Sequence, residues 1–161
     1  MSQRGGERRK AREFALQLLF QLDLSPDDVQ DAVERFWEGK KVAEATQAFT
    51  LQLVEGTMAH RAALDELIAS HAAHWRISRM PVVDRNILRM ALCEFFLDPQ
   101  TPRIVVIDEA IEIAKKYGND ESGPFINGIL DAVRIKLEAG DLDLPASLAI
   151  PATAVHERST A

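Results

Sequence analysis

The stretch from Asp84 to Leu97 constrains the fold of this chain more than any other. It reads DRNILRMALCEFFL, and at 100° per residue its apolar side chains cover almost the whole circumference of a helix. Arg85 and Arg89 remain as a narrow charged ridge. A helix that is apolar on nearly every side must be surrounded by other helices. The pattern therefore predicts a central buried helix, with the two arginines where its neighbours leave its surface open.

The rest of the chain repeats apolar residues at helical spacing. Although Ile104 to Ile107 alone could form a strand, the i, i+3, i+4, i+7 spacing that follows favours a helix. Ser25 and Ser122 are predicted to cap the second and last helices, and Gly56 is expected to divide a long helical segment. The chain is thus predicted to be all-α, with helical segments at 7–22, 26–37, 42–75, 84–97, 104–117 and 123–139.

With 161 residues, the chain is long enough for one compact domain and too short for two large ones. The helical pattern breaks from Ile77 to Pro81, which we interpret as the boundary between two helical subdomains, at 1–78 and 79–140. Beyond Gly140 the sequence is rich in Ala, Pro and Ser, so residues 141–161 are predicted to form a flexible tail.

Charge is distributed unevenly along the chain. The net charge is −6, yet the first twelve residues carry five basic side chains against Glu7 alone, namely Arg4, Arg8, Arg9, Lys10 and Arg12. Cations at a helix start oppose the helix dipole, so we expect an anion to relieve this cost. A solubilising, frayed N-terminus explains the segment equally well.

Several classes of protein are excluded or disfavoured. No run of 18 apolar residues could cross a membrane, so we expect a cytoplasmic protein. The chain lacks GxxxxGK[ST], GxGxxG, HExxH and CxxC motifs. His71 with His74, and Glu109 with Glu112, lie one helical turn apart, but such pairs are more typical of solvated helix faces than of metal or acid–base sites. We therefore expect no enzyme activity, no metal and no cofactor.

Four blocks follow one another in the second half of the chain: DRNILRMALCEF at 84–95, DPQTP at 98–102, VVIDEAIEIAKKYG at 105–118 and FINGILD at 125–131. Together they resemble the NusB family of bacterial transcription antitermination factors. The N-terminal RRKAREFALQLLF at 8–20 is similar to the opening of that family as well. The resemblance covers residues 8 to about 137, and its strength lies in the order and spacing of the blocks.

The resemblance implies a helical fold of about seven helices in two subdomains without catalytic activity. It also implies binding to the single-stranded box A RNA of ribosomal RNA operons together with NusE, a ribosomal small-subunit protein, within the RNA polymerase elongation complex. The implied RNA surface comprises Arg8, Arg9, Lys10, Arg12, Phe20, Glu121 and Phe125. Asp84 occupies a position associated with the NusE contact.

Residue chemistry agrees with these roles, because cations bind phosphates and aromatic faces stack on bases. For Phe20 and Phe125, burial in the core is the alternative. A carboxylate such as Glu121 repels phosphate, but it could lower the affinity or accept a hydrogen bond from a cytosine amino group. The alternative function is a helical protein–protein adaptor without specific RNA binding. The oligomeric state stays open, a homodimer included.

Overall fold

The computed structural model describes residues 2–142 and 148, with side chains from residue 6 onward. Every regular element in this part of the chain is helical, which confirms the all-α prediction. The described residues form seven α-helices and one 3₁₀ turn: α1 Ser2–Leu24, α2 Val29–Trp37, α3 Glu44–Ala59, α4 Arg61–His71, η1 Ile77–Arg79, α5 Val82–Leu97, α6 Arg103–Tyr117 and α7 Ser122–Ala139.

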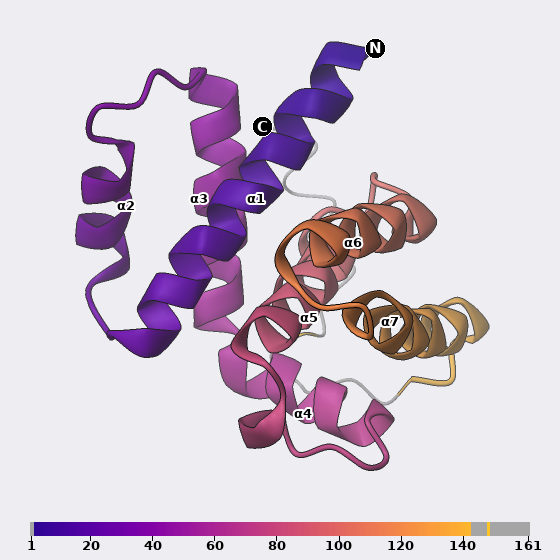
Figure 1. Ribbon diagram of the computed structural model, residues 1–161. Coiled ribbons are helices and arrows are strands. Elements are labelled where there is room, and N and C mark those ends of the chain that lie inside the picture. Colours follow the sequence, from indigo (N-terminus) through magenta and orange to yellow (C-terminus); the bar gives the residue numbers. More distant parts are fainter. Residues whose placement is uncertain (1, 143–147, 149–161) are drawn as a thin grey trace.

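Helix α5 is the centre of the fold, as its apolar circumference predicts. Twelve of its residues are buried, including Ile87, Leu88 and Leu92. Five helices pack against it: α1, α3, α4, α6 and α7. Figure 1 shows α5 between the α1–α3 group on one side and the α6–α7 pair on the other. Residues of all seven helices join in one continuous apolar core. The turn η1 falls at the predicted boundary between the two helical groups.

The two arginines of α5 are not an open ridge, contrary to the sequence-based prediction. Arg89 is only 3% exposed, and it donates two hydrogen bonds to Asp65 of α4, at 2.6 and 2.9 Å. Arg85 donates to Asp23 of α1 at 3.0 and 2.8 Å. Burial alone would raise the pKa of Asp23, but the hydrogen bonds from Arg85 and Asn86 outweigh it and lower the pKa. These charges join α1, α4 and α5.

Helix α2 begins later than predicted. Ser25 does not cap it, because α1 continues to Leu24 and the Ser25 N–H donates to the Gln21 carbonyl at 2.9 Å. The cap is Asp28, whose side chain accepts a hydrogen bond from the Asp31 N–H at 3.1 Å. The negative charge of Asp28 also interacts favourably with the positive end of the helix dipole.

Gly56 lies inside α3, and the break between α3 and α4 comes at His60 instead. Its role is close packing: a Cβ at this position would lie 2.9 Å from Cys93 Sγ and would clash with Leu97, both on α5. Gly56 therefore allows α3 to approach α5 closely and does not end the helix.

Most of the predicted tail lies outside the described residues. Within it, Leu148 is described, and it is 4% exposed and belongs to the core. Among the helices of the described residues, none combines the length and apolarity that a membrane span requires.

Candidate nucleic-acid interface

The exposed arginines at the start of α1 are held by acids from other helices. Arg8 Nη1 lies 2.8 Å from Asp98 Oδ2, just after α5. Arg9 donates to both carboxylate oxygens of Glu109 on α6, at 2.8 and 2.9 Å. Each arginine side chain is still about half exposed, at 47% for Arg8 and 51% for Arg9. The pairs therefore orient the guanidinium groups while leaving donors free for an anionic ligand.

These ion pairs also lower the pKa of the two acids, Glu109 and Asp98. The hydrogen bond from Arg9 lowers the pKa of Glu109. Burial would raise the pKa of Asp98, but hydrogen bonds from Thr101 and Arg8 overcome it and lower the pKa. The anions expected to relieve the basic helix start are thus carboxylates of the protein itself.

Arg12 has a different place from the other predicted RNA-binding cations. It is 4% exposed and forms a bidentate pair with Glu94 of α5, with Nε to Oε1 at 2.8 Å and Nη2 to Oε2 at 2.6 Å. Its guanidinium faces the interior and is not presented to a ligand. Lys10, by contrast, is exposed.

Phe20 lies on the outer face of α1 and is 38% exposed. It shares this face with Arg9 and Glu13, at helical spacing. Glu13 accepts hydrogen bonds from Lys116 at 3.1 and 3.2 Å, and from the Tyr117 hydroxyl at 3.5 Å. The end of α6 therefore borders this face of α1. Neither Lys116 nor Tyr117 was identified from the sequence, because only the fold brings them beside Glu13.

The first residue of α7 contacts the first turn of α5. Ser122 does not cap α7 in the predicted way: it is the first helical residue, and its hydroxyl donates to Asp84 Oδ1 at 2.7 Å. Asp23 near the end of α1 contacts Arg85, and Ser122 at the start of α7 contacts Asp84, so α1 and α7 are both attached to the first turn of α5.

Asp84 is itself 4% exposed, so its carboxylate presents almost no surface to a partner. Burial raises the pKa of Asp84, and the hydrogen bond from Ser122 opposes this shift in part. In the structure, Asp84 joins α5 to α7 through its hydrogen bond with Ser122.

Phe125 is half-buried on α7, and Trp75 packs against it. The two rings meet edge to face, with centroids 6.2 Å apart and an interplanar angle of 71°. Trp75 is 54% exposed, in the turn after α4. Together the rings form an aromatic surface of which the sequence predicts only Phe125. Glu121, the residue before α7, is exposed beside it.

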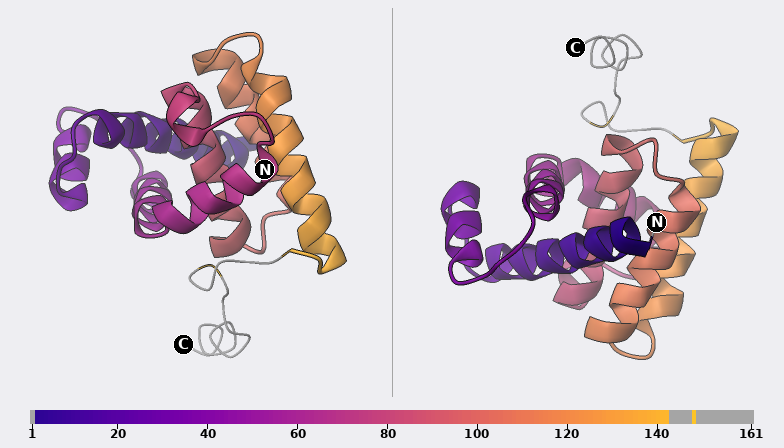
Figure 2. Two further views of the ribbon diagram at one scale, coloured as in Figure 1. Left: turned by 90° about the horizontal axis from the view of Figure 1, so that it is seen from below. Right: turned by 90° about the horizontal axis from the view of Figure 1, so that it is seen from above.

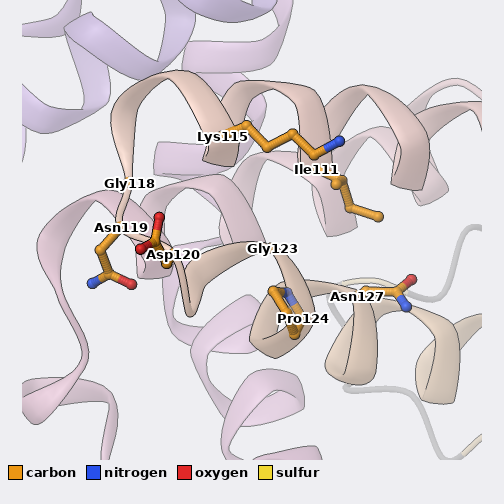
Figure 3. Close-up of a pocket in the computed structure, with 8 residues that line it drawn as sticks. All are labelled: Ile111, Lys115, Gly118, Asn119, Asp120, Gly123, Pro124 and Asn127. Carbon is orange, nitrogen blue, oxygen red and sulfur yellow. The ribbon is translucent and has the colours of Figure 1, made fainter.

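A pocket of about 630 Å³ lies between α6 and α7. Figure 3 shows its lining, with Asn119 and Asp120 in the turn between the helices. Lys115 supplies a cation, and Asn127 an amide, from the two helices. The pocket mixes donors and acceptors, as base recognition requires. Among the described residues, no three His, Cys, Asp or Glu side chains gather to hold a metal ion.

Comparison with known proteins gives consistent matches. The sequence profile of the NusB family matches residues 9–134. The transcription antitermination protein NusB of Koribacter versatilis is 44% identical over 86% of this chain and 96% of its own length. The protein of the same name from Trichlorobacter lovleyi is 48% identical over 78% of this chain and 89% of its own.

Solved structures agree with these relatives. NusB of T. maritima has a TM-score of 0.75 at 33% identity, covering 84% of this chain and 97% of that one. A structure of the antitermination factors NusB and NusE in complex with double-stranded RNA matches with a TM-score of 0.72 at 26% identity. That match covers 79% of this chain and 95% of the other.

Proposed function

The chain belongs to the NusB family, and we propose from this membership and from the surface described above that it is a transcription antitermination factor that binds RNA together with NusE. The observation that carries the proposal is the exposed face of α1. It presents the half-exposed Arg8 and Arg9 near its start and the exposed Phe20 toward its end, and α5 packs both against α1 and against α7, the helix that carries Phe125.

The proposed RNA is a single-stranded box A element. Arg8, Arg9 and Lys10 bind phosphates, and Phe20 and Phe125 stack on bases, each stack contributing about 1–3 kcal/mol. Glu121 accepts a hydrogen bond from a base amino group. NusE docks near the first turn of α5, where Asp84 holds α7 in place, and the complex acts in the cytoplasm on the RNA polymerase elongation complex.

An alternative has one observation in its favour. Arg8 and Arg9 already pair with acids, so the cations could serve only to hold the helices together in a protein–protein adaptor. Under the RNA proposal, phosphates share the guanidinium groups with those carboxylates or displace them at a cost, so we expect high affinity for RNA to require NusE.

The distinguishing experiment is a salt series of box A RNA binding, with and without NusE. We expect weak binding by the chain alone, tighter binding with NusE, and an affinity that falls steeply as salt rises. No RNA binding under either condition, with the NusE complex still formed, would support the adaptor instead.

A further inference from the structure

A groove of about 670 Å³ lies between the first turns of α1 and the connection from α2 to α3. The groove is on the side of α1 that faces α2 and α3. Figure 2 shows α1 along its length, with α2 and α3 on that side. The lining residues come from both segments: Gly6, Glu7, Lys10, Phe14, Lys40, Lys41, Val42, Ala43 and Thr46. None of the candidate sites predicted from the sequence lies here except Lys10.

The groove concentrates positive charge on an acidic protein. It contains three lysines and a single acid, Glu7, although the chain as a whole carries a net charge of −6. All three lysines are exposed. Among the described residues, none of them takes part in an ion pair, whereas each of the arginines in α1 with a described side chain does. No carboxylate of the described residues therefore pairs with these three ammonium groups.

Local structure fixes the position of Lys40 and places Lys41 directly after it. Gly39 has a φ of +76°, a conformation that favours glycine, and it turns the chain directly after α2. Lys40 Nζ then donates to the Phe36 carbonyl at 2.6 Å and lies 4.2 Å from the centre of the Phe36 ring. This contact stabilises the ammonium group without neutralising it. Lys41 follows in the lining of the groove, and its ammonium group makes no hydrogen bond or ion pair with the described residues.

The character of the groove indicates which anion it fits. A site for one small anion needs buried donors that converge, but here the three cations are exposed in an open groove. Exposed cations in an open groove suit a chain of phosphates whose contacts are independent of sequence. Lys10 follows Arg9 in α1, but the two side chains lie about 100° apart around the helix, so the groove is a separate surface on the α2–α3 side of α1, next to the face assigned above to RNA.

We propose that Lys10, Lys40 and Lys41 bind the phosphate backbone of RNA that flanks the recognised element. This inference rests on the proposed function and extends it, because it adds Lys40 and Lys41 to the RNA surface. An acidic protein segment is the other ligand such a groove could take, and the experiment below separates the two.

The test uses the full chain with NusE and two RNAs: a minimal box A oligonucleotide, and one extended by flanking nucleotides at both ends. Lys41→Ala should weaken binding of the extended RNA about fivefold at about 0.1 M salt and reduce the salt slope by about 0.7. Lys41→Glu should weaken it further, and Lys41→Arg should retain it. Binding of the minimal RNA should change much less.

Lys136→Ala is the matched control, because Lys136 is an exposed lysine near the far end of α7. Equal effects of Lys41→Ala and Lys136→Ala on the extended RNA would overturn the proposal. Unchanged RNA affinity with weakened NusE binding would also overturn it and assign the groove to a protein. If Lys41→Ala weakens RNA binding but box A and scrambled RNA bind equally, the groove stands and the antitermination function fails. If the wild-type chain binds no RNA, both fail.

Discussion

Arg12 of α1 and Glu94 of α5 form a buried, bidentate ion pair, with side chains 5% and 1% exposed. They are 82 positions apart in the sequence, and their contact fixes the first helix against the central one. An isolated charge at this depth would be strongly destabilising, so each residue depends on the other. The basic start of the chain thus combines an internal structural cation with cations that face outward.

Arg12→Ala should lower the free energy of unfolding by about 3–5 kcal/mol, because it leaves Glu94 buried and unpaired. Arg9→Ala is the control: its pair with Glu109 is half exposed, and its loss should cost less than about 1 kcal/mol. Urea denaturation measures both. A similar small loss for the two variants would show that the Arg12 pair is not the structural contact described here.

Asp84→Asn should leave stability at neutral pH unchanged or higher. Burial raises the pKa of Asp84 above its usual value of 3.8, so the carboxyl favours folding when protonated, and this contribution is lost as pH rises through the raised pKa. An amide carbonyl at this position can still accept the Ser122 hydrogen bond. Thermal unfolding between about pH 4 and 8 should show a flatter pH dependence for Asp84→Asn than for the wild type. Ser122→Ala should lower the stability over the whole of this pH range. If Asp84→Asn lowered the stability as much as Ser122→Ala does, this interpretation would be wrong.

Two glycines of the α6–α7 region should respond in opposite directions to substitution by alanine. At Gly118, a Cβ would lie 2.5 Å from Ser122 Oγ and 2.8 Å from the Ala114 carbonyl, so Gly118→Ala should cost about 1–3 kcal/mol. Gly128 lies within α7 with nothing within 4 Å of such a Cβ, and Gly128→Ala should gain about 0.5–1 kcal/mol. Equal effects in chemical denaturation would contradict this packing.

Phe125→Ala should weaken box A binding in the presence of NusE by more than about 1 kcal/mol, through the loss of a stacking surface. Because Trp75 packs on Phe125, Trp75→Ala should lower the affinity as well. Fluorescence anisotropy measures the affinity, and a thermal melt of each variant is the control. An unchanged affinity with a lower melting temperature would place both rings in the core alone.

The sequence predicts helix α5 well, because an apolar circumference is a local property that needs no knowledge of partners. It predicts Arg89 and Arg12 poorly for the opposite reason. A guanidinium can be buried only when an acid meets it, and the acids Asp65 and Glu94 are 24 and 82 positions away. The spacing of residues in the sequence reports on a single helix, so it does not reveal ion pairs between different helices.

The same limit applies to the candidate site. Phe20 and Phe125 can be selected because each matches a position of the family pattern. Trp75 and Lys41 cannot, since one lies in a turn after α4 and the other in the connection from α2 to α3. Only the fold brings Trp75 against Phe125 of α7, and Lys41 into one groove with Lys10 of α1. A local signal existed at Gly39 alone, where a glycine followed by two lysines ends a helix.

The most direct test of the account compares the dissociation constants of box A RNA and a scrambled RNA of equal length and composition, each titrated with the chain and NusE in one buffer. Because phosphate contacts are shared by both RNAs, any difference reports recognition of bases. We predict tighter binding of box A RNA, by a ratio that Phe125→Ala reduces. Equal dissociation constants for the two RNAs would contradict the account.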